Sequence, residues 1–581
     1  MSDSRQELAL EQKLKQERDR LHKELWDIAD SLRGSVDGWD FKAYVLGLMF
    51  YRFLSENLTD YINQGEWDAE DKSFDYAMLS DEDAEDARED IVASTGFFIL
   101  PSELFGNVLA RLNTSKDLMN FAPNPEANKD DPNSQFLGLN EFLKQVFEHI
   151  ENSAQGTPSE EHFKGLFADI DVDSNKLGST PSKRNEKLKQ LLIAINKLQL
   201  SDRKQIAEKL QSSYADNIIQ SASVGYTDYH TYSIDAFGDA YEYLMSMYAS
   251  QAGKSGGEFF TPHDVAVLLA KLVTAGKKEV NTVYDPACGS GSLLLQVVKV
   301  LGEANILKGI YGQEINHTTY NLCRINMILH DVGFDKFNIV CEDTLTEPEY
   351  NEVAPFDIIV SNPPYSIEWE GADNASLLID PRFTPAGVLA PKNKADMAFI
   401  MHIRSYLAPQ GTAAVVCFPG VMYRGGAEKQ IRSFLVDENL VDCVIQLPSN
   451  LFFGTSIATC IMVLKKNKQD NHILFIDASK EFVKVGKDNR LTQGNIEHIV
   501  EAFKARKDVA YFVHSAPYEE VVEHDYNLSP NSYIESEDTR EQIDIAKVNA
   551  ELKEIVASAN ALRQEIDKFI ATVEVGVWAV P

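Results

Sequence analysis

The sequence has few cysteines and no long apolar run. Its 581 residues include 6 cysteines, and none of them forms a CxxC pair. That pairing is typical of zinc sites and redox enzymes, so we expect no bound metal, no structural disulfide and a reduced, cytoplasmic protein. Because no stretch of about 18 uncharged apolar residues occurs, we expect no transmembrane helix and no membrane association. The charged N-terminus also lacks the apolar segment of a secretory signal.

Basic residues are scarce relative to acidic ones. Lysine and arginine together number 55, against 89 aspartates and glutamates, and the net charge is -34. Affinity for a phosphate backbone comes largely from basic side chains, so this balance disfavours a protein that grips nucleic acid alone. Two interpretations remain open. The chain is either a subunit that acts on nucleic acid held by a partner, or a protein whose charge serves only solubility.

The apolar patterns divide the chain into three predicted domains. Residues 1–225 show helical periodicity, with a very apolar helix at 41–63 that should be buried. In residues 226–480 short apolar runs alternate with helical segments, which predicts an α/β domain with a doubly wound, mostly parallel sheet. Residues 481–581 are predicted to be a helical region and tail for subunit association. The expected strands are 281–285, 309–314, 337–343, 356–361, 412–418, 442–447 and 458–465.

The C-terminal region carries an apolar repeat of seven residues. One series runs from Ile545 to Val573, and a second, offset by three residues, runs from Val548 to Phe569. Such a and d positions, sustained over more than three heptads, are typical of a coiled coil. We expect this helix to contact a partner helix, in this chain or another. The alternative is a helix that packs on its own domain.

The stretch VYDPACGSGSLLL, residues 283–295, predicts a strand that ends at Asp285 and turns into a helix. The turn contains Gly289, Ser290, Gly291 and Ser292. Glycines let a backbone approach a ligand closely, and the N-terminus of the following helix presents free N–H groups. The stretch is neither the GxGxxG dinucleotide motif nor a phosphate loop, because no GK[ST] follows. A tight strand-to-helix turn without a ligand is the alternative.

Acidic residues also end the next two predicted strands. Glu314 lies where an acid commonly holds ribose hydroxyls, and Asp343 can accept a hydrogen bond from an adenine amino group. One such acid is most often a helix cap or a solvent-facing charge. Three of them at successive strand ends, beside a glycine turn, indicate a nucleoside site. They would repel the phosphates of a nucleotide.

The stretch FDIIVSNPPYS, residues 356–366, predicts a buried strand that runs into a rigid turn. The turn lies at the carboxyl end of a strand, where open α/β sheets place their ligands. The amide oxygen of Asn362 and the carbonyl of Pro363 can accept both hydrogens of an exocyclic amine, which directs its lone pair toward an incoming methyl group. Tyr365 offers a flat face for a substrate ring. A double-proline strand terminator is the alternative.

The motifs DPACGSG and NPPY together resemble those of amino-methyltransferases that use S-adenosylmethionine. The stretch GGEFFTP, residues 256–262, is similar to the cofactor motif that comes first in one permutation of the DNA adenine methyltransferases. Five other stretches are similar to the modification subunit of type I restriction–modification systems: 33–57, 238–245, 394–402, 418–432 and 451–464. The resemblance covers roughly residues 20–575.

The resemblance implies an adenine-N6 DNA methyltransferase subunit with a Rossmann-like core, whose mostly parallel sheet has one antiparallel strand. The implied residues for S-adenosyl-L-methionine are Glu258, Phe259, Phe260, Thr261, Pro262, His263, Asp285, Gly289, Ser290, Gly291, Ser292, Glu314 and Asp343. Among them, Glu314 would contact the ribose, Asp285 the methionine amino group and Asp343 the adenine. The target adenine would be held by Asn362, Pro363, Pro364 and Tyr365. Phe452 or Phe453 would pack on its other face, with a core role as the alternative for either.

The implied partners are double-stranded DNA, a specificity subunit and a restriction motor subunit. Two copies of this chain would join one specificity subunit, which reads the site. This chain and the specificity subunit would both be required for restriction. A duplex hides the target amino group in the base stack, so the base must be flipped out, which costs free energy. An acidic chain without an evident recognition module is poorly equipped to supply that energy.

Other functions fit parts of the pattern. A methyltransferase for another planar amide, such as a protein glutamine, would also use NPPY, although it needs neither the long helical part nor the heptads. A non-catalytic scaffold could keep the fold, although the intact Asn362, Tyr365 and Glu314 argue against it. A self-contained restriction enzyme is disfavoured, because no nuclease motif and no separate target-recognition domain is evident.

Overall fold

The computed structural model describes residues 16–28, 40–68, 71, 73–128, 134–198, 200, 236–251, 261–452, 455–486, 488–535 and 545–576. The chain forms two compact units, Met1–Ile534 and Glu535–Pro581. None of the helices in the described ranges is both long enough and apolar enough to cross a membrane.

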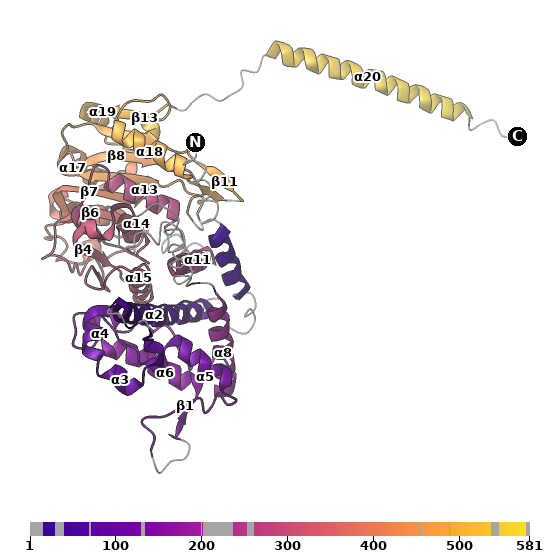
Figure 1. The fold of residues 1–581 in the computed structure, drawn as a ribbon. Coiled ribbons are helices and arrows are strands. Elements are labelled where there is room, and N and C mark those ends of the chain that lie inside the picture. Colours follow the sequence, from indigo (N-terminus) through magenta and orange to yellow (C-terminus); the bar gives the residue numbers. More distant parts are fainter. Residues whose placement is uncertain are drawn as a thin grey trace, which may run out of the picture. The chain divides into compact units, whose positions relative to one another are not determined.

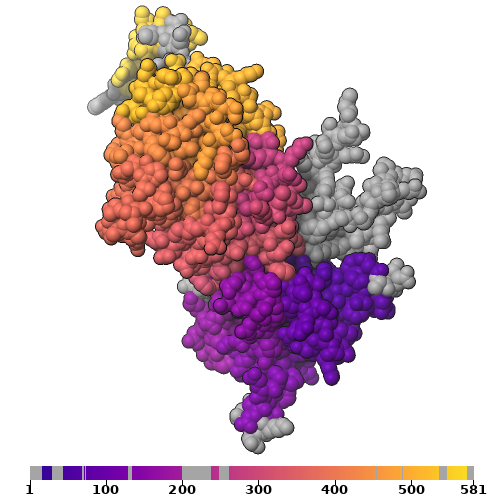
Figure 2. Space-filling model, turned by 90° about the vertical axis from the view of Figure 1, so that its left-hand side faces the viewer, coloured from indigo at the N-terminus to yellow at the C-terminus, as the bar shows by residue number. Residues whose placement is uncertain are grey.

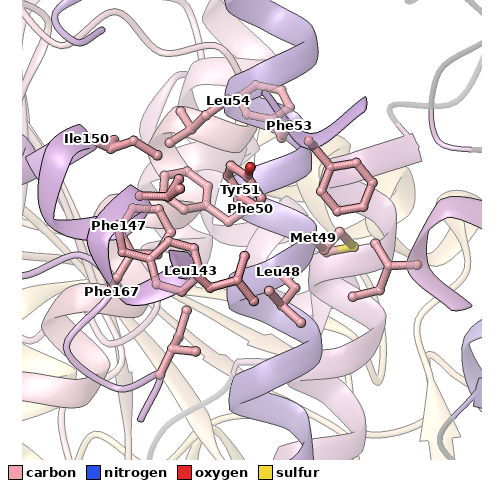
Figure 3. Packing of buried hydrophobic residues seen from close by; sticks show 14 of the residues in the cluster. Leu48, Met49, Phe50, Tyr51, Phe53, Leu54, Leu143, Phe147, Ile150 and Phe167 are labelled. Atoms are coloured by element: carbon pink, nitrogen blue, oxygen red, sulfur yellow. The ribbon is translucent and has the colours of Figure 1, made fainter. Parts of the chain in front are cut away.

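The helical part of the first unit is built around α2, Asp40–Asp68. Figure 3 shows side chains of α2 packed against α6, Leu139–Ser153, and against Phe167. The ring of Phe147 stacks on that of Phe167 with centroids 4.4 Å apart, and Phe50 lies 5.6 Å from the same ring. A helix that is apolar on most sides is stable only inside a core. The buried helix predicted for this stretch is therefore confirmed.

Shorter helices surround α2. They are α3 (Asp81–Glu85), α4 (Arg88–Thr95), α5 (Phe105–Thr114), α7 (Glu160–Phe163), α8 (Pro181–Lys197) and α11 (Ala236–Gln251). A two-stranded sheet of β1 (Ala122–Pro123) and β2 (Phe136–Leu137) accompanies them, and residues 16–28 form a further helix. The helical character predicted for the first part of the chain is confirmed in these ranges, while the exact domain boundaries stay a prediction.

A nine-stranded sheet forms the second part of this unit, in the order β13-β10-β8-β9-β7-β6-β3-β4-β5. Its strands are β3 (Val280–Asp285), β4 (Ile306–Gln313), β5 (Phe337–Val340), β6 (Phe356–Ser361), β7 (Leu407–Cys417), β8 (Val441–Gln446), β9 (Cys460–Lys465), β10 (Ile473–Asp477) and β13 (Val513–Ala516). Every predicted strand is present. β9 is antiparallel to β7 and β8, as expected for one strand, and the edge strand β13 is a second antiparallel one. Its four residues, VHSA, carry too little apolar character to predict a strand.

Helices cover both faces of the sheet (Figure 1). One face carries α13 (His263–Val273), α14 (Ser292–Leu301), α15 (His317–Leu329) and α18 (Gln493–Ala505), and the other carries α16 (Asp396–Tyr406), α17 (Ala427–Asp437) and α19 (Tyr518–Glu523). Successive strand residues point to opposite faces, so Val283 joins the first core and Tyr284 the second. Burial on both sides explains the continuous apolar runs of the strands. The doubly wound α/β class is confirmed.

The helical part and the sheet share an apolar contact. Ile325 and Leu329 of α15 are buried in the core of the helical part, although α15 connects two strands of the sheet. In Figure 2 the helical part, in indigo and purple, lies directly against the magenta and red residues, which come later in the chain and form the sheet and its helices. A short hairpin of β11 (Val483–Val485) and β12 (Asp488–Arg490) follows β10.

The second unit contains the helix α20, Ile545–Gly576. It confirms a helix over the predicted heptads. Every residue from 546 to 571 is exposed, and the apolar positions Leu552 and Phe569 are 58% and 72% exposed. The apolar stripe is therefore open to solvent along the described side chains.

Candidate active site

The acidic strand ends and the NPPY turn come together at one edge of the sheet. β6, β3, β4 and β5 are consecutive parallel neighbours, so their carboxyl ends lie side by side. Asp285 ends β3, Glu314 follows β4, Asp343 lies beyond β5 and Asn362 follows β6. The chain leaves β3 on one side toward β4 and β5 and returns on the other side at β6. Such a switch point is where open α/β sheets bind their ligands.

The turn between β3 and α14 needs glycine. Gly291 has φ of +79°, in the left-handed region that favours glycine. A Cβ there would lie 2.7 Å from Sγ of Cys323 and 2.8 Å from Cε of Met327, both on α15. Gly289 also has a positive φ, of 54°, and its N–H donates to Oε2 of Glu314 at 3.0 Å. The left-handed backbone and the close packing against α15 thus both require glycine at position 291.

Glu314 holds two elements together. Besides the bond from Gly289, its Oε1 accepts from the N–H of Asn316 at 2.9 Å, at the start of α15. Burial raises the pKa of Glu314, while these backbone N–H groups oppose the shift by favouring the charged form. Each carboxylate oxygen keeps a second lone pair, so Glu314 can still accept hydrogen bonds from a ligand.

Asp285 is fully buried at the end of β3. Its Oδ1 accepts from the N–H of Ala287 at 3.0 Å, whereas its Oδ2 accepts no hydrogen bond from the described residues. Burial raises the pKa of Asp285 to about 7 and the nearby charge of Glu314 adds to the shift, while the N–H of Ala287 and the nearby hydroxyl of Ser361 oppose it. A buried carboxylate oxygen without a donor costs free energy, so the position favours a ligand that brings a donor or a positive charge.

The turn that presents Asp343 is fixed by two residues that the sequence did not single out. Oδ1 of Asp343 accepts from the N–H of Leu345 at 2.9 Å. The hydroxyl of Thr344 donates to the carbonyl of Pro286 at 2.5 Å and so ties this turn to the glycine turn. The buried guanidinium of Arg382 donates to the carbonyls of Thr344 at 2.8 Å and Leu345 at 2.7 Å.

Arg382 also connects this turn to β3 through a histidine. It donates to Nδ1 of His402, 3.0 Å away, and Nε2 of His402 lies 3.1 Å from the hydroxyl of Tyr284. Because arginine can only donate, Nδ1 accepts, and Nε2 carries the proton and donates to Tyr284. Burial lowers the pKa of His402 well below its usual value, and the charge of Arg382 adds to this, so the imidazole stays neutral. The segment that follows NPPY is thus joined to the strand that ends at Asp285.

The NPPY turn contacts the predicted cofactor segment directly. Nδ2 of Asn362 donates to the hydroxyl oxygen of Thr261 at 3.1 Å, and its Oδ1 accepts from the hydroxyl of Tyr365 at 2.7 Å. The N–H of Ser366 donates to Oδ2 of Asp396 at 3.0 Å, which supports a non-glycine residue with φ of +51°. The amide oxygen predicted to accept from a target amine is therefore bonded to Tyr365 in this structure.

The other residues predicted to contact the cofactor or the target base differ in burial and in their contacts. Pro262 is buried, and His263 is exposed at the start of α13. The carbonyl of Ser290 accepts from Nδ2 of Asn326 at 2.8 Å, a contact that no motif indicated. Phe452 is 3% exposed and belongs to the apolar core, which favours its packing role over a base-stacking one. Four predicted residues lie outside the described ranges: Glu258, Phe259, Phe260 and Phe453.

Family models match most of the chain. The model described as N-6 DNA Methylase matches residues 232–542, which include every strand of the large sheet. The model described as HsdM N-terminal domain matches residues 21–195, which include α2 to α7 and all but the last two residues of α8. The first match covers more than half of the 581 residues.

Named relatives agree with the family models. The type I restriction enzyme MpnII methylase subunit of Mycoplasma pneumoniae is 47% identical over 580 residues, which cover 97% of this chain and 98% of that protein. The HindI methylase subunit of Haemophilus influenzae is 31% identical over 72% of this chain and 96% of its own length.

Two solved structures of related subunits are similar to this chain. The crystal structure of the type I restriction-modification system methyltransferase subunit from Streptococcus thermophilus has a TM-score of 0.73 and 34% identity, and the match covers 89% of this chain and 100% of that chain. A modification subunit of a putative type I restriction enzyme from Vibrio vulnificus, at 19% identity and a TM-score of 0.54 over 87% of this chain and 93% of its own, shares the fold. These findings confirm the resemblance seen in the sequence motifs. The chain belongs to the N6-adenine DNA methyltransferase family, as a methylase subunit of type I restriction–modification systems.

Proposed function

We propose that this chain transfers a methyl group from S-adenosyl-L-methionine to N6 of an adenine in a DNA site that a specificity subunit selects. The observation that carries the proposal is the arrangement at the switch point. The glycine turn and three carboxylates surround one side of it, and the NPPY turn lies on the other. The hydrogen bond from Asn362 to Thr261 joins the two sides.

The residues on the first side fit S-adenosylmethionine. Oδ2 of Asp285, buried without a donor among the described residues, suits the methionine ammonium group. Glu314 suits the ribose hydroxyls and Asp343 the adenine amino group. The absence of a side chain at Gly291 lets α15 pack directly against the turn, which holds the backbone that the ligand would contact. When bound, S-adenosylmethionine supplies a methyl group that is activated by the positive charge on its sulfur.

The NPPY turn provides the acceptors for the target amine. The oxygen of Asn362 and the carbonyl of Pro363 accept its two hydrogens, so the lone pair points away from them toward the methyl donor. Tyr365 packs against the base ring. Oδ1 of Asn362 has a second lone pair, so it can accept from the amine while it keeps the hydrogen bond from the hydroxyl of Tyr365. Methyl transfer is an in-line displacement, so orientation by these groups supplies much of the catalysis.

The DNA site is chosen by a partner in this proposal. The net charge of -34 disfavours tight binding of a phosphate backbone by this chain alone. The exposed heptad residues of α20 fit a helix of the specificity subunit in a coiled coil, as apolar a and d positions require. Two copies of this chain and one specificity subunit then form the methyltransferase, which a restriction motor subunit joins for DNA cleavage. Residues 1–225, 226–480 and 481–581 serve as helical, catalytic and association domains.

Co-expression with the specificity subunit tests the catalytic proposal. The purified complex should methylate duplex DNA at N6 of adenine, and sequencing that detects methylated adenines identifies the site. Asn362→Ala should bind S-adenosylmethionine with unchanged affinity and lose transfer by at least about 100-fold. Asn467→Ala, in an exposed position beyond the end of β9, is the matched control and should keep full activity. Retained transfer in Asn362→Ala, or methyl incorporation into a protein glutamine instead of DNA, would contradict the proposal.

Removal of α20 tests the association proposal. A chain that ends at residue 540 should keep its affinity for S-adenosylmethionine, because the sheet and its helices lie in the first unit. It should no longer elute with the specificity subunit in gel filtration. An intact complex without α20 would show that the heptads serve another purpose.

A further inference from the structure

One face of α15 belongs to the helical part of the protein. Ile325 and Leu329 are buried in the apolar core of that part. The hydroxyl of Thr318 donates to Asp169 at 3.0 Å. The carbonyl of Leu322 accepts from the hydroxyl of Tyr241, on α11, at 2.6 Å. Figure 1 shows α15 close to α2 and α11, which it contacts.

Arg324 makes the most extensive polar contact on this face. Only 1% of its surface is exposed. Its Nη1 donates to the carbonyls of Glu161 at 2.8 Å and Lys164 at 3.0 Å, at the C-terminal end of α7. Nη2 donates to the side chain of Asn321, and the guanidinium lies 4.2 Å from the ring centre of Tyr320. Carbonyls at a helix end lack partners within the helix, so a charged donor there stabilises the contact.

The opposite face of α15 supports the glycine turn. Sγ of Cys323 and Cε of Met327 occupy the space that a Cβ of Gly291 would need. Nδ2 of Asn326, a residue 1% exposed, donates to the carbonyl of Ser290 at 2.8 Å. Arg324 and Asn326 are two positions apart on a helix, so they point in different directions. The same short stretch of α15 therefore contacts the helical part with one residue and the turn with another.

The start of α15 is attached to the same turn. Glu314 accepts from the N–H of Gly289 with one oxygen and from the N–H of Asn316 with the other. The turn is thus held to α15 at its beginning, through Glu314, and at its middle, through Asn326 and the packing of Gly291. Close-packed interiors leave no slack for one of these groups to move alone. A displacement of α15 changes the turn.

We propose that Arg324 is a positioning residue that couples the docking of the helical part on α15 to the affinity of the glycine turn for S-adenosylmethionine. This inference depends on the proposed function, in which the turn binds that cofactor. If the hydrogen bonds from Arg324 to α7 are weakened, α15 can move relative to the helical part, and the position of the backbone at Ser290 is less well fixed. Coupling is reciprocal, so a cofactor bound at the turn must strengthen the contact between Arg324 and α7 by the same factor.

The first test compares two arginines in the full-length chain. Arg324→Lys keeps the charge but loses the planar fork that serves both carbonyls. We expect its Kd for S-adenosylmethionine, measured by titration calorimetry, to rise about tenfold. The matched control is Arg52→Lys. Arg52 is also buried and donates to two carbonyls at a helix end, those of Ile195 at 2.7 Å and Leu198 at 2.9 Å, but within the helical part.

Both variants should lower the thermal stability of the chain, and only Arg324→Lys should weaken cofactor binding. Unchanged affinity in Arg324→Lys would refute the coupling, and so would an equal loss of affinity in Arg52→Lys. If the unaltered chain bound no S-adenosylmethionine at all, the proposed function would fail instead, which separates the two conclusions. The two variants are compared by their affinity for S-adenosylmethionine, because a purely structural role of Arg324 would leave this affinity unchanged.

The second test uses the unaltered chain, so it decides the matter even if Arg324→Lys does not fold. Hydrogen exchange of backbone amides is followed with and without S-adenosylmethionine. Reciprocal coupling predicts slower exchange in the cofactor complex for peptides that cover residues 160–168, as well as for the glycine turn and α15. Protection of the turn without any protection of residues 160–168 would overturn the proposal.

Discussion

The buried carboxyl of Asp285 should make cofactor binding depend on pH. Its pKa rises from the ordinary value of 3.8 to about 7 because the group is fully buried, and the charge of Glu314 adds to this, while the N–H of Ala287 and the hydroxyl of Ser361 oppose the shift. One pKa unit corresponds to 1.36 kcal/mol, so ionising Asp285 in the free protein costs about 4 kcal/mol more than in water. A raised pKa of an acid means that the folded chain holds a proton which the unfolded chain has lost. Stability of the free protein therefore falls as the pH rises from about 4 through 7.

A bound ammonium group reverses this preference, because the ion pair needs the charged carboxylate. Below pH 7 the cofactor must expel the proton of Asp285, and its Kd should rise by up to tenfold for each pH unit. At pH 5 binding should be roughly 50-fold weaker than at pH 7, where half of the carboxyl groups are already ionised. Above a pH of about 8 the α-amino group loses its own proton, so affinity should be highest between these two values.

Titration calorimetry between pH 5 and pH 8 measures this effect. At pH 6, two buffers of different ionisation enthalpy should report the release of close to one proton per S-adenosylmethionine bound. Asp285→Asn keeps the shape without the titration, so it should bind more weakly at pH 7.5 and show little change from pH 5 to pH 7. Burial also raises the pKa of Glu314, and the charge of Glu314 adds to the raised pKa of Asp285, so Glu314→Gln should keep the pH dependence of binding but move it to lower pH. A flat wild-type profile, or a slope that survives in Asp285→Asn, would refute the reasoning.

Three further results are expected. Gly291→Ala should lower the free energy of unfolding by about 3 kcal/mol, because the strain of a left-handed alanine and the clash with α15 add. The control Gly276→Ala, where φ is +78° and no atom lies within 4 Å of the added Cβ, should cost about 1 kcal/mol from strain alone. Equal losses of the two variants in urea unfolding would contradict this. Asp396→Asn removes the charged acceptor of Ser366 and should reduce kcat about tenfold with unchanged Kd for S-adenosylmethionine, so a change in Kd alone would count against it. Burial and the charge of Arg324 lower the pKa of His162 to about 4, so protonation of His162 should cost up to about 3 kcal/mol of the free energy of unfolding between pH 6.5 and pH 4, opposite in sign to the contribution of Asp285. The free energy of unfolding of His162→Leu should therefore rise relative to the unaltered chain as the pH falls through this range, and a constant difference between the two would contradict this.

The large features of the fold could be predicted because they depend on periodicity. β6 occupies the residues that its apolar run predicted, 356–361, since both of its faces are buried in the two cores of the sheet. β10 and β13 were not predicted. β10 has five residues, ILFID, and β13 has four, so neither gives a pattern long enough to distinguish a strand from a loop. Their place in the sheet is set by tertiary packing.

The acids of the candidate site could also be predicted, because parallel strands in a doubly wound sheet end at the same edge. The residues that hold those acids could not. Arg382 lies outside the helices and strands, and it contacts Thr344, 38 residues earlier, and His402, 20 residues later. No motif or residue spacing in the sequence predicts such contacts. Asn326 and Arg324 lie in a helix whose period shows two buried faces but does not say which face meets the glycine turn.

The resting hydrogen bonds of the NPPY turn bear on how a target base is brought to it. Oδ1 of Asn362 already accepts from Tyr365, and Nδ2 already donates to Thr261, so an arriving base can add only a bond to the second lone pair of Oδ1, in exchange for one with water. Exchange of one hydrogen bond for another contributes only about 1 kcal/mol, which is less than the few kcal/mol needed to unstack and unpair an adenine. The turn can therefore orient a flipped base but cannot drive the flipping. In the proposed complex that energy would come from DNA contacts of the specificity subunit, since a net charge of -34 disfavours phosphate contacts by this chain, and the exposed stripe of α20 is the proposed attachment to that subunit.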